Sequence, residues 1–258
     1  GRTTLNGEGL QHEDGHSHIQ AALIPNCVAY DPTYAYEVAV IVQDGLRRMV
    51  AEREDVFFYL TVMNENYEQP ALPEGSEDAI LRGMHRIAEA GDGDGPTVQL
   101  LGSGTILREV LAAAELLRED WGVQSDVWSV TSFTQLRRDG LEADRVSRLH
   151  PENERVVPYV EEQLAGKGPV VAATDYVRAF ADQIRQWIDA PYEVLGTDGY
   201  GRSDYRVALR SFFEVDRFHV TVAALYRLAL AGTIEASVVA DAIKKYDIDT
   251  DGAAPWLR

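Results

Sequence analysis

Short apolar runs alternate with longer amphipathic segments along most of the chain. Six runs have the length and the β-branched or aromatic content of buried strands, and they lie at residues 26–30, 56–63, 97–102, 126–130, 169–173 and 192–196. Helical periodicity predicts one helix capped by Thr33 and others at residues 76–90, 105–121, from 134 onward, 157–164, 176–187, 205–212, 220–231 and 236–246. This alternation predicts an α/β fold with three layers, α/β/α, and mostly parallel sheets.

Two loop-like stretches interrupt the pattern and suggest a domain boundary. Residues 64–75 are polar and contain two prolines and a glycine, and residues 90–96, AGDGDGP, are predicted to form a flexible loop. We place the boundary at the first stretch. Residues 1–72 would then be the end of one domain, and residues 73–258 would form a second α/β domain.

Composition narrows the class of protein. A chain of 258 residues with 45% hydrophobic residues can form one large or two medium domains. Its net charge of −18 argues against nucleic acid and anionic membranes as partners. No apolar run approaches the ~20 residues that cross a bilayer. Cys27 is the single cysteine, which excludes an intrachain disulfide and fits a reducing, cytoplasmic compartment.

The residues best suited to catalysis or metal binding lie near the start of the chain. Three histidines, His12, His16 and His18, lie within seven residues together with Glu13 and Asp14. Imidazoles beside carboxylates on a glycine-rich loop can hydrogen bond to a reacting oxygen or bind a metal. If residues 12–16 formed a helix, His12 and His16 would lie on one face and could bind a metal, but the glycine between them favours a loop. A merely solvated connection remains an alternative for the same residues.

Three other segments give weaker indications of function. The strand–glycine–helix junction at 101–105 could hold an anion, although a tight turn capped by Ser103 or Thr105 is the preferred interpretation. Residues 247–252 have the alternating acids of a calcium loop, but Arg258 stands where that loop needs glutamate. The loop at 197–204 should lie at the carboxyl edge of the sheet, where α/β proteins bind ligands, and we favour a subunit interface for its Arg202.

Several stretches together resemble one enzyme family. They are GRTTLNGEGLQHEDGHSHI, IPNCVAYDPTYAYEVAVI, MNENYEQPALPEG, VQLLGSGTILREV, SDVWSVTSF, VLGTDGYGRSD and FFEVD. Nearly end to end, the chain resembles the C-terminal part of the homodimeric bacterial pyruvate dehydrogenase, the decarboxylating component of its complex. The Glu13-Asp14-Gly15 and His18 core and the GYGRSD loop are also similar to those of more distant transketolases.

The resemblance implies a division of the chain and a cofactor. Residues 1–72 would end the pyrimidine-binding middle domain, and residues 73–258 would be a transketolase C-terminal-like domain. The family uses thiamin diphosphate and Mg²⁺, whose main binding residues lie in portions that this sequence lacks. The Gly91-Asp92-Gly93 stretch is similar to the opening of the thiamin diphosphate motif, but the next asparagine is Asn153, so we interpret it as a linker. We therefore expect a fragment that is inactive alone.

The resemblance also implies a reaction, partners and site residues. The reaction would be decarboxylation of pyruvate and reductive acetylation of the lipoyl group on the dihydrolipoamide acetyltransferase component. The partners would be a second copy, in a homodimer, and the missing N-terminal portion. His12 is the first catalytic candidate, as a hydrogen-bond donor to an oxygen of the pyruvate adduct, and His18 and Asp14 rank second. The roles of His16 and Glu13 stay open. The alternatives are a noncatalytic acidic assembly module or a transketolase-type enzyme.

Overall fold

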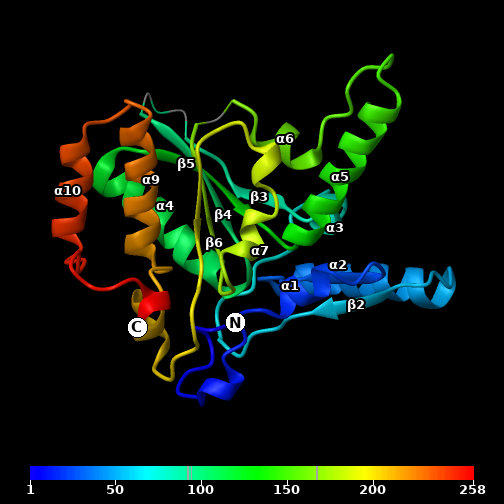
Figure 1. Cartoon of the computed structure of the whole chain (residues 1–258), viewed down its shortest axis with the longest axis horizontal. Coiled ribbons are helices and arrows are strands. Elements are labelled where there is room, and N and C mark those ends of the chain that lie inside the picture. Colours follow the sequence, from blue (N-terminus) through cyan, green and yellow to red (C-terminus); the bar gives the residue numbers. More distant parts are fainter. Residues whose placement is uncertain (92, 94, 167) are drawn as a thin grey trace.

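The larger of two sheets has five strands and lies at the centre of the molecule (Figure 1). A computed structural model describes all residues except 92, 94 and 167, so part of the predicted 91–93 linker lies outside the described residues. The strand order is β3-β5-β4-β6-β7, and β3 alone pairs antiparallel to its neighbour among these strands. The strands are β3 (His85–Ala88), β4 (Thr97–Gly102), β5 (Gln124–Ser129), β6 (Val170–Ala173) and β7 (Tyr192–Leu195).

Helices cover both faces of this sheet, as the predicted three-layer α/β/α fold requires (Figure 1). One face packs against α4 (Leu107–Trp121), α8 (Arg206–Phe212), α9 (Arg217–Leu230) and α10 (Ala236–Lys245). The other face packs against α5 (Phe133–Leu149), α6 (Tyr159–Leu164) and α7 (Ala179–Asp182). Along β4, Leu100 faces the first layer and Leu101 the second, which is the alternation that a sheet buried on both faces requires.

The second sheet pairs β1 (Cys27–Tyr30) with β2 (Phe57–Leu60) in parallel. Helix α2 (Ala35–Leu46), continued by the π-helix η2 (Arg47–Ala51), follows β1 and joins it to β2. Helix α1 (Ser17–Ala22) contributes Ala21 to a small core that includes Cys27, which is buried as predicted. The predicted domain boundary after residue 72 stays a prediction.

Three predicted helices differ from those observed. Residues 76–90 form α3 (Glu77–Arg82) followed by β3, because Gly83 adopts a φ of 114° that ends the helix and leaves the next residues to pair with β5. Residues 176–187 contain α7 and the short 3-10 turn η4 (Arg185–Trp187) instead of one helix. The backbone of Tyr176 and Val177 bonds to other loops, which removes the first turn of the predicted helix. Helix α2 begins at Ala35 and Tyr34 is its N-cap, so the prediction that Thr33 is the cap was wrong.

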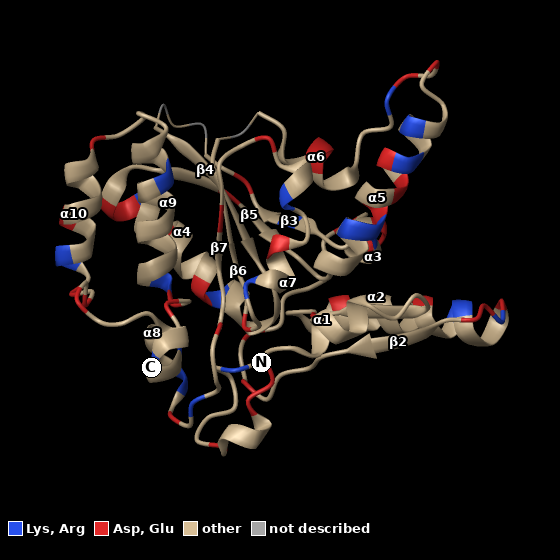
Figure 2. Cartoon of the chain, in the orientation of Figure 1, with Lys and Arg blue, Asp and Glu red and all other residues tan. Residues whose placement is uncertain are grey.

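Figure 2 shows where the charged residues lie in the fold. Helix α5 carries residues of both signs along its length, and further charged residues lie around the N-terminal segment (Figure 2). Within the residues that the structure describes, no helix has the length and apolar character needed to span a bilayer.

Candidate functional site

The histidine-rich segment lies against the carboxyl edge of the five-stranded sheet. Its lead-in, Arg2, Thr3 and Thr4, is almost fully buried among the loops that follow β4, β6 and β7. Further along, the amide of Gly7 donates a hydrogen bond of 2.9 Å to the carbonyl oxygen of Asp204. The loop at 197–204 was predicted to lie at this edge, and it is the loop that the segment contacts.

Arg2 joins the histidine segment to that loop. Its guanidinium donates to the carbonyl oxygens of Thr197 and Gly199, and its Nη2 lies 3.4 Å from Nδ1 of His16. A Cβ on Gly15 would lie 2.4 Å from Nε of Arg2, so glycine is required for this close packing. Burial lowers the pKa of Arg2, although Asp14 among other nearby carboxylates acts in the opposite direction.

Asp14 holds the turn that leads into α1. Its Oδ1 accepts from the amides of His16 (2.9 Å) and Ser17 (3.0 Å), and its Oδ2 accepts from the Ser17 hydroxyl. Burial alone would raise the pKa of Asp14, but these three donors outweigh it and the pKa is lowered. Asp14 is therefore an ionised structural carboxylate in this chain, with its oxygens occupied by the local turn.

His18 is buried in an aromatic pocket. Its ring stacks on Phe180 with centroids 4.5 Å apart, and the ring of Tyr176 meets it edge-on at 4.6 Å. Burial lowers the pKa of His18 to about 3, so the imidazole is neutral at physiological pH. Its Nε2 lies 2.9 Å from the hydroxyl oxygen of Thr61, which itself donates to Oδ1 of Asp31 at 2.7 Å. Thr61 therefore accepts from Nε2 of His18, and the buried Nδ1 is left as an acceptor.

Glu13 and Asp31 are buried acids with incompletely satisfied oxygens. Within the described part of the chain, neither oxygen of Glu13 has a hydrogen-bond partner, and neither has Oδ2 of Asp31. Burial, reinforced by Asp175, raises the pKa of Glu13 to about 7, and burial raises the pKa of Asp31 to about 6. A Cβ on Gly201 would lie 2.3 Å from Cβ of Glu13, so the later loop packs directly on this residue.

His12 and His16 differ from these buried residues because their side chains are exposed. His12 ends the 3-10 turn η1 (Leu10–His12), and His16 is the N-cap of α1 with a non-helical backbone. The two histidines therefore do not lie on one face of a helix, which the metal interpretation of their spacing required. The catalytic ranking of His12, His18 and Asp14 stays a prediction.

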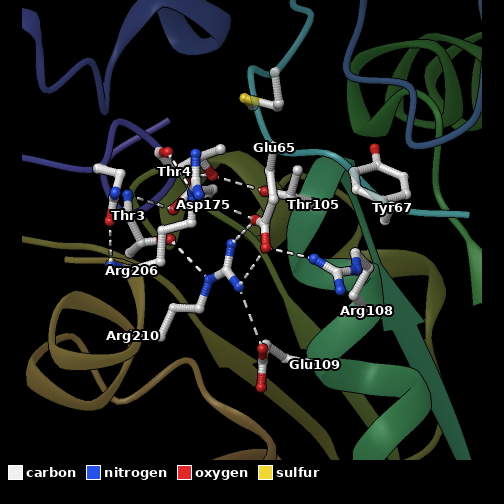
Figure 3. A network of polar contacts seen from close by, with 12 residues as sticks. Thr3, Thr4, Glu65, Tyr67, Thr105, Arg108, Glu109, Asp175, Arg206 and Arg210 are labelled. Carbon is white, nitrogen blue, oxygen red and sulfur yellow. Dashed lines mark hydrogen bonds and ion pairs between the residues drawn. The ribbon is translucent and has the colours of Figure 1, made fainter.

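Several polar residues around the site were missed by the sequence reasoning. Asp175 follows β6, and its Oδ1 accepts from the amide of Thr3 at 2.9 Å while Oδ2 accepts from the Thr4 hydroxyl at 2.8 Å. The Thr105 hydroxyl, 2.7 Å from Oγ1 of Thr4, completes this chain of hydrogen bonds (Figure 3). Asp175 follows a predicted buried strand, and that position was the signal that could have identified it.

A buried charge cluster lies beside these residues (Figure 3). Glu65 accepts from Arg210 and Arg108, and Arg210 also lies 3.3 Å from Glu109. Burial alone would raise the pKa of Glu65, but Arg210 and its neighbours lower it. Arg206 donates to the carbonyl oxygen of Thr4 at 2.8 Å, so the cluster also contacts the lead-in to the histidine segment.

Across residues 1–91, 93, 95–166 and 168–258, no three histidine, cysteine or acidic side chains are grouped so that they could hold a metal ion. The 101–105 junction is occupied by the protein itself, because Ser103 Oγ lies 3.1 Å from Thr174 Oγ1 and Thr105 bonds to Thr4. Ser103 is the N-cap residue of the 3-10 turn η3 (Gly104–Ile106), as predicted, but its hydroxyl makes no capping hydrogen bond.

The arrangement of sheet, helices and loops matches a known domain class. A model of the transketolase-like TK C-terminal domain matches residues 83–216, and the chain therefore belongs to this family. The transketolase of Pichia stipitis has the same fold, with a TM-score of 0.63 at 16% identity over 89% of this chain and 29% of its own. A split-gene transketolase, described as an inactive β4 tetramer, gives a TM-score of 0.53 at 18% identity over 86% of this chain and 64% of its own.

Relatives of higher sequence identity are pyruvate dehydrogenase E1 components. Residues 1–70 match a model of the pyruvate dehydrogenase E1 component middle domain. The pyruvate dehydrogenase E1 component of Pseudomonas aeruginosa is 60% identical over 99% of this chain. That of Escherichia coli K12 is 57% identical over 100% of this chain. The recognition of this family from the sequence is confirmed. The chain spans 29% of the length of each of these two relatives.

Proposed function

We propose that the chain is the C-terminal part of a pyruvate dehydrogenase E1 component. The whole enzyme would decarboxylate pyruvate and reductively acetylate the lipoyl group of a dihydrolipoamide acetyltransferase. The observation that carries this proposal is the 57–60% identity to relatives of that name over almost the whole chain. A transketolase-type reaction is less well supported, because the transketolase structures are only 16–18% identical and establish the fold alone.

The missing portion of the enzyme holds the cofactor in this proposal. Thiamin diphosphate with Mg²⁺ supplies the carbanion chemistry of such enzymes when bound. The share of the relatives that this chain spans, 29%, supports this placement because most of the enzyme lies outside it. We propose a cytoplasmic homodimer in which residues 1–72 complete the middle domain and residues 73–258 support assembly.

The exposed His12 is the residue of this chain that we propose to meet substrate. It lies at the end of a short turn, where its imidazole is free to donate a hydrogen bond to a substrate oxygen. His18 is neutral and its buried Nδ1 is left as an acceptor, and Asp14 fixes the backbone between His12 and His18. In this arrangement Asp14 acts through the loop, since its oxygens are occupied by local donors.

Substitution of His12 tests the proposal in the complete enzyme. With thiamin diphosphate and Mg²⁺ supplied, pyruvate-dependent reduction of an artificial electron acceptor is expected to fall about 10²-fold or more in His12→Ala. His150→Ala is the matched control, because this side chain is 57% exposed on the distant end of α5 and should be replaceable without loss. Full activity in His12→Ala would remove His12 from the mechanism. Absence of pyruvate turnover in the unmodified enzyme would contradict the proposed function itself.

The isolated chain is expected to be inactive for a separate reason. It spans 29% of the length of its pyruvate dehydrogenase relatives, so most of such an enzyme lies outside it. A precedent in the same fold is the split-gene transketolase chain that is described as inactive. Pyruvate turnover by the purified chain alone would show that the cofactor site has been assigned to the wrong portion.

A further inference from the structure

The lead-in to the histidine segment is held by residues of the C-terminal α/β domain. Thr3 and Thr4 are 0% and 1% exposed, and their polar groups are satisfied by partners far along the sequence. Buried polar groups without partners cost free energy, so these contacts fix the lead-in at one place on the sheet edge. We propose that Asp175 is the positioning residue that, through Thr3 and Thr4, sets the location of the turn bearing His12. This inference rests on the proposed function.

Asp175 makes more of these contacts than any single neighbour shown in Figure 3. Its two carboxylate oxygens accept from the Thr3 amide at 2.9 Å and from the Thr4 hydroxyl at 2.8 Å. Its carbonyl oxygen also accepts from the amide of Arg2 at 3.0 Å. Three successive residues are thus bonded to one residue, which is itself fully buried at the end of β6.

The directions of these hydrogen bonds determine which side chain could replace that of Asp175. The Thr4 hydroxyl donates to Oδ2 of Asp175, so the Thr105 hydroxyl must donate to Oγ1 of Thr4. An asparagine at 175 can keep this chain with its direction reversed: its amide nitrogen donates to Thr4, and Thr4 then donates to Thr105. Its oxygen still accepts from the Thr3 amide. A positioning role therefore tolerates Asp175→Asn, whereas a role that needs a charge or a transferable proton does not.

The turn bearing His12 depends on this anchor because the segment between them is held less firmly. After Thr4, the side chains of Asn6 and Glu8 are exposed, and the amide of Gly7 donates to the carbonyl oxygen of Asp204. The chain is next buried at Glu13, after the turn itself. Loss of the anchor therefore weakens one end of the segment, which then depends on the bonds from Arg206 to Thr4 and from Gly7 to Asp204, while α1 holds the other end. A displacement of about 1 Å in a reacting group can cost about 10²-fold in rate.

The kinetic test uses the complete enzyme and a double-mutant cycle. Asp175→Ala is expected to lower kcat by about 10²-fold, and Asp175→Asn is expected to retain most of it. In the His12→Ala background, Asp175→Ala should add little further loss, because its effect acts through the same group. Asp182→Ala is the control, since this acid on α7 is 45% exposed and pairs locally with Arg185. Losses that multiply in the double variant, or an Asp175→Asn variant as slow as Asp175→Ala, would overturn the proposal.

A structural readout separates this proposal from the proposed function. Hydrogen exchange of the amides in residues 5–15 should accelerate in Asp175→Ala, and remain near the parent rate in Asp175→Asn and Asp182→Ala. This measurement does not require turnover, so it decides the anchoring role even if pyruvate is not the substrate. Unchanged exchange in a folded Asp175→Ala protein would refute the anchor. Should Asp175→Ala fail to fold, Thr4→Ala removes the bonds to Asp175 and Thr105 and is subject to the same two measurements.

Discussion

Glu37 joins three parts of the chain through one buried carboxylate, and its removal is expected to be strongly destabilising. Its Oε2 accepts from the amides of Thr33 (2.6 Å) and Tyr34 (3.0 Å), at the start of α2. Its Oε1 accepts from Oγ of Ser129 on β5 (2.6 Å) and lies 2.8 Å from Nε2 of His85 on β3. The residue is 0% exposed, so none of these groups can turn to water when the carboxylate is lost.

The expected loss for Glu37→Ala follows from those four contacts. A hydrogen bond to a charged group contributes about 1.5–3 kcal/mol, but bonds to one carboxylate are not additive. A buried donor left without its partner costs about 1–3 kcal/mol, and Glu37→Ala leaves several donors in this state. We therefore expect Glu37→Ala to lower the free energy of unfolding by about 4 kcal/mol. Glu37→Gln keeps an oxygen for the two amides and should lose about half as much.

Urea unfolding of the purified chain measures this effect. The midpoint concentration should fall in Glu37→Ala while the slope with urea stays unchanged, because the surface exposed on unfolding is similar. Glu77→Ala is the control, since it removes an exposed acid from the first turn of α3 and should change the free energy by less than about 0.5 kcal/mol. A Glu37→Ala loss below about 1 kcal/mol would refute the view that this carboxylate is a required link between α2 and the five-stranded sheet.

Two further predictions concern the pH dependence of stability. Burial raises the pKa of Glu13 from 4.5 to about 7, so its contribution is present below pH 4.5 and is lost as the pH rises through about 7. Glu13→Gln should therefore flatten the thermal unfolding midpoint across pH 4.5–7, and an unchanged slope would contradict the assignment. Burial lowers the pKa of His18 from 6.5 to about 3, so its contribution is present above pH 6.5 and is lost as the pH falls towards 3. His18→Asn should reduce the loss of stability on that acid side, and an equally steep loss would show that another group causes it.

Regular elements with strong periodicity could be predicted from the sequence, but elements decided by tertiary contacts could not. The strands at 97–102 and 169–173 consist mostly of apolar residues, and both are observed as β4 and β6. The segment 76–90 has helical periodicity, yet only its first half is helical. The outer edge of β5 provides unpaired backbone groups that His85–Ala88 satisfies as β3. Local periodicity contains no information about such an open edge.

The candidate site shows the same division between local and long-range information. The unusual density of histidines and acids identified residues 12–18 without any structure. Arg2, Thr3 and Thr4 have an ordinary composition, and their importance depends on partners more than 100 residues away, at Thr105, Asp175 and Thr197. Burial also changes what each acid can do. Asp14 is held ionised by local donors, whereas the adjacent Glu13 has its pKa raised to about 7.

The topology of the five-stranded sheet places residues 2–4 at the edge where α/β proteins bind ligands. In open α/β sheets, ligands bind at the carboxyl ends of strands where the chain order reverses, and here that point lies between β4 and β6. Thr105 follows β4 and Asp175 follows β6, and the side chain of Thr4 is bound between them. The position that a small molecule occupies in other α/β proteins is thus filled by Thr4 of this chain. In the mechanism that we propose, the domain acts on the reaction through this segment, because the segment leads to the turn bearing His12.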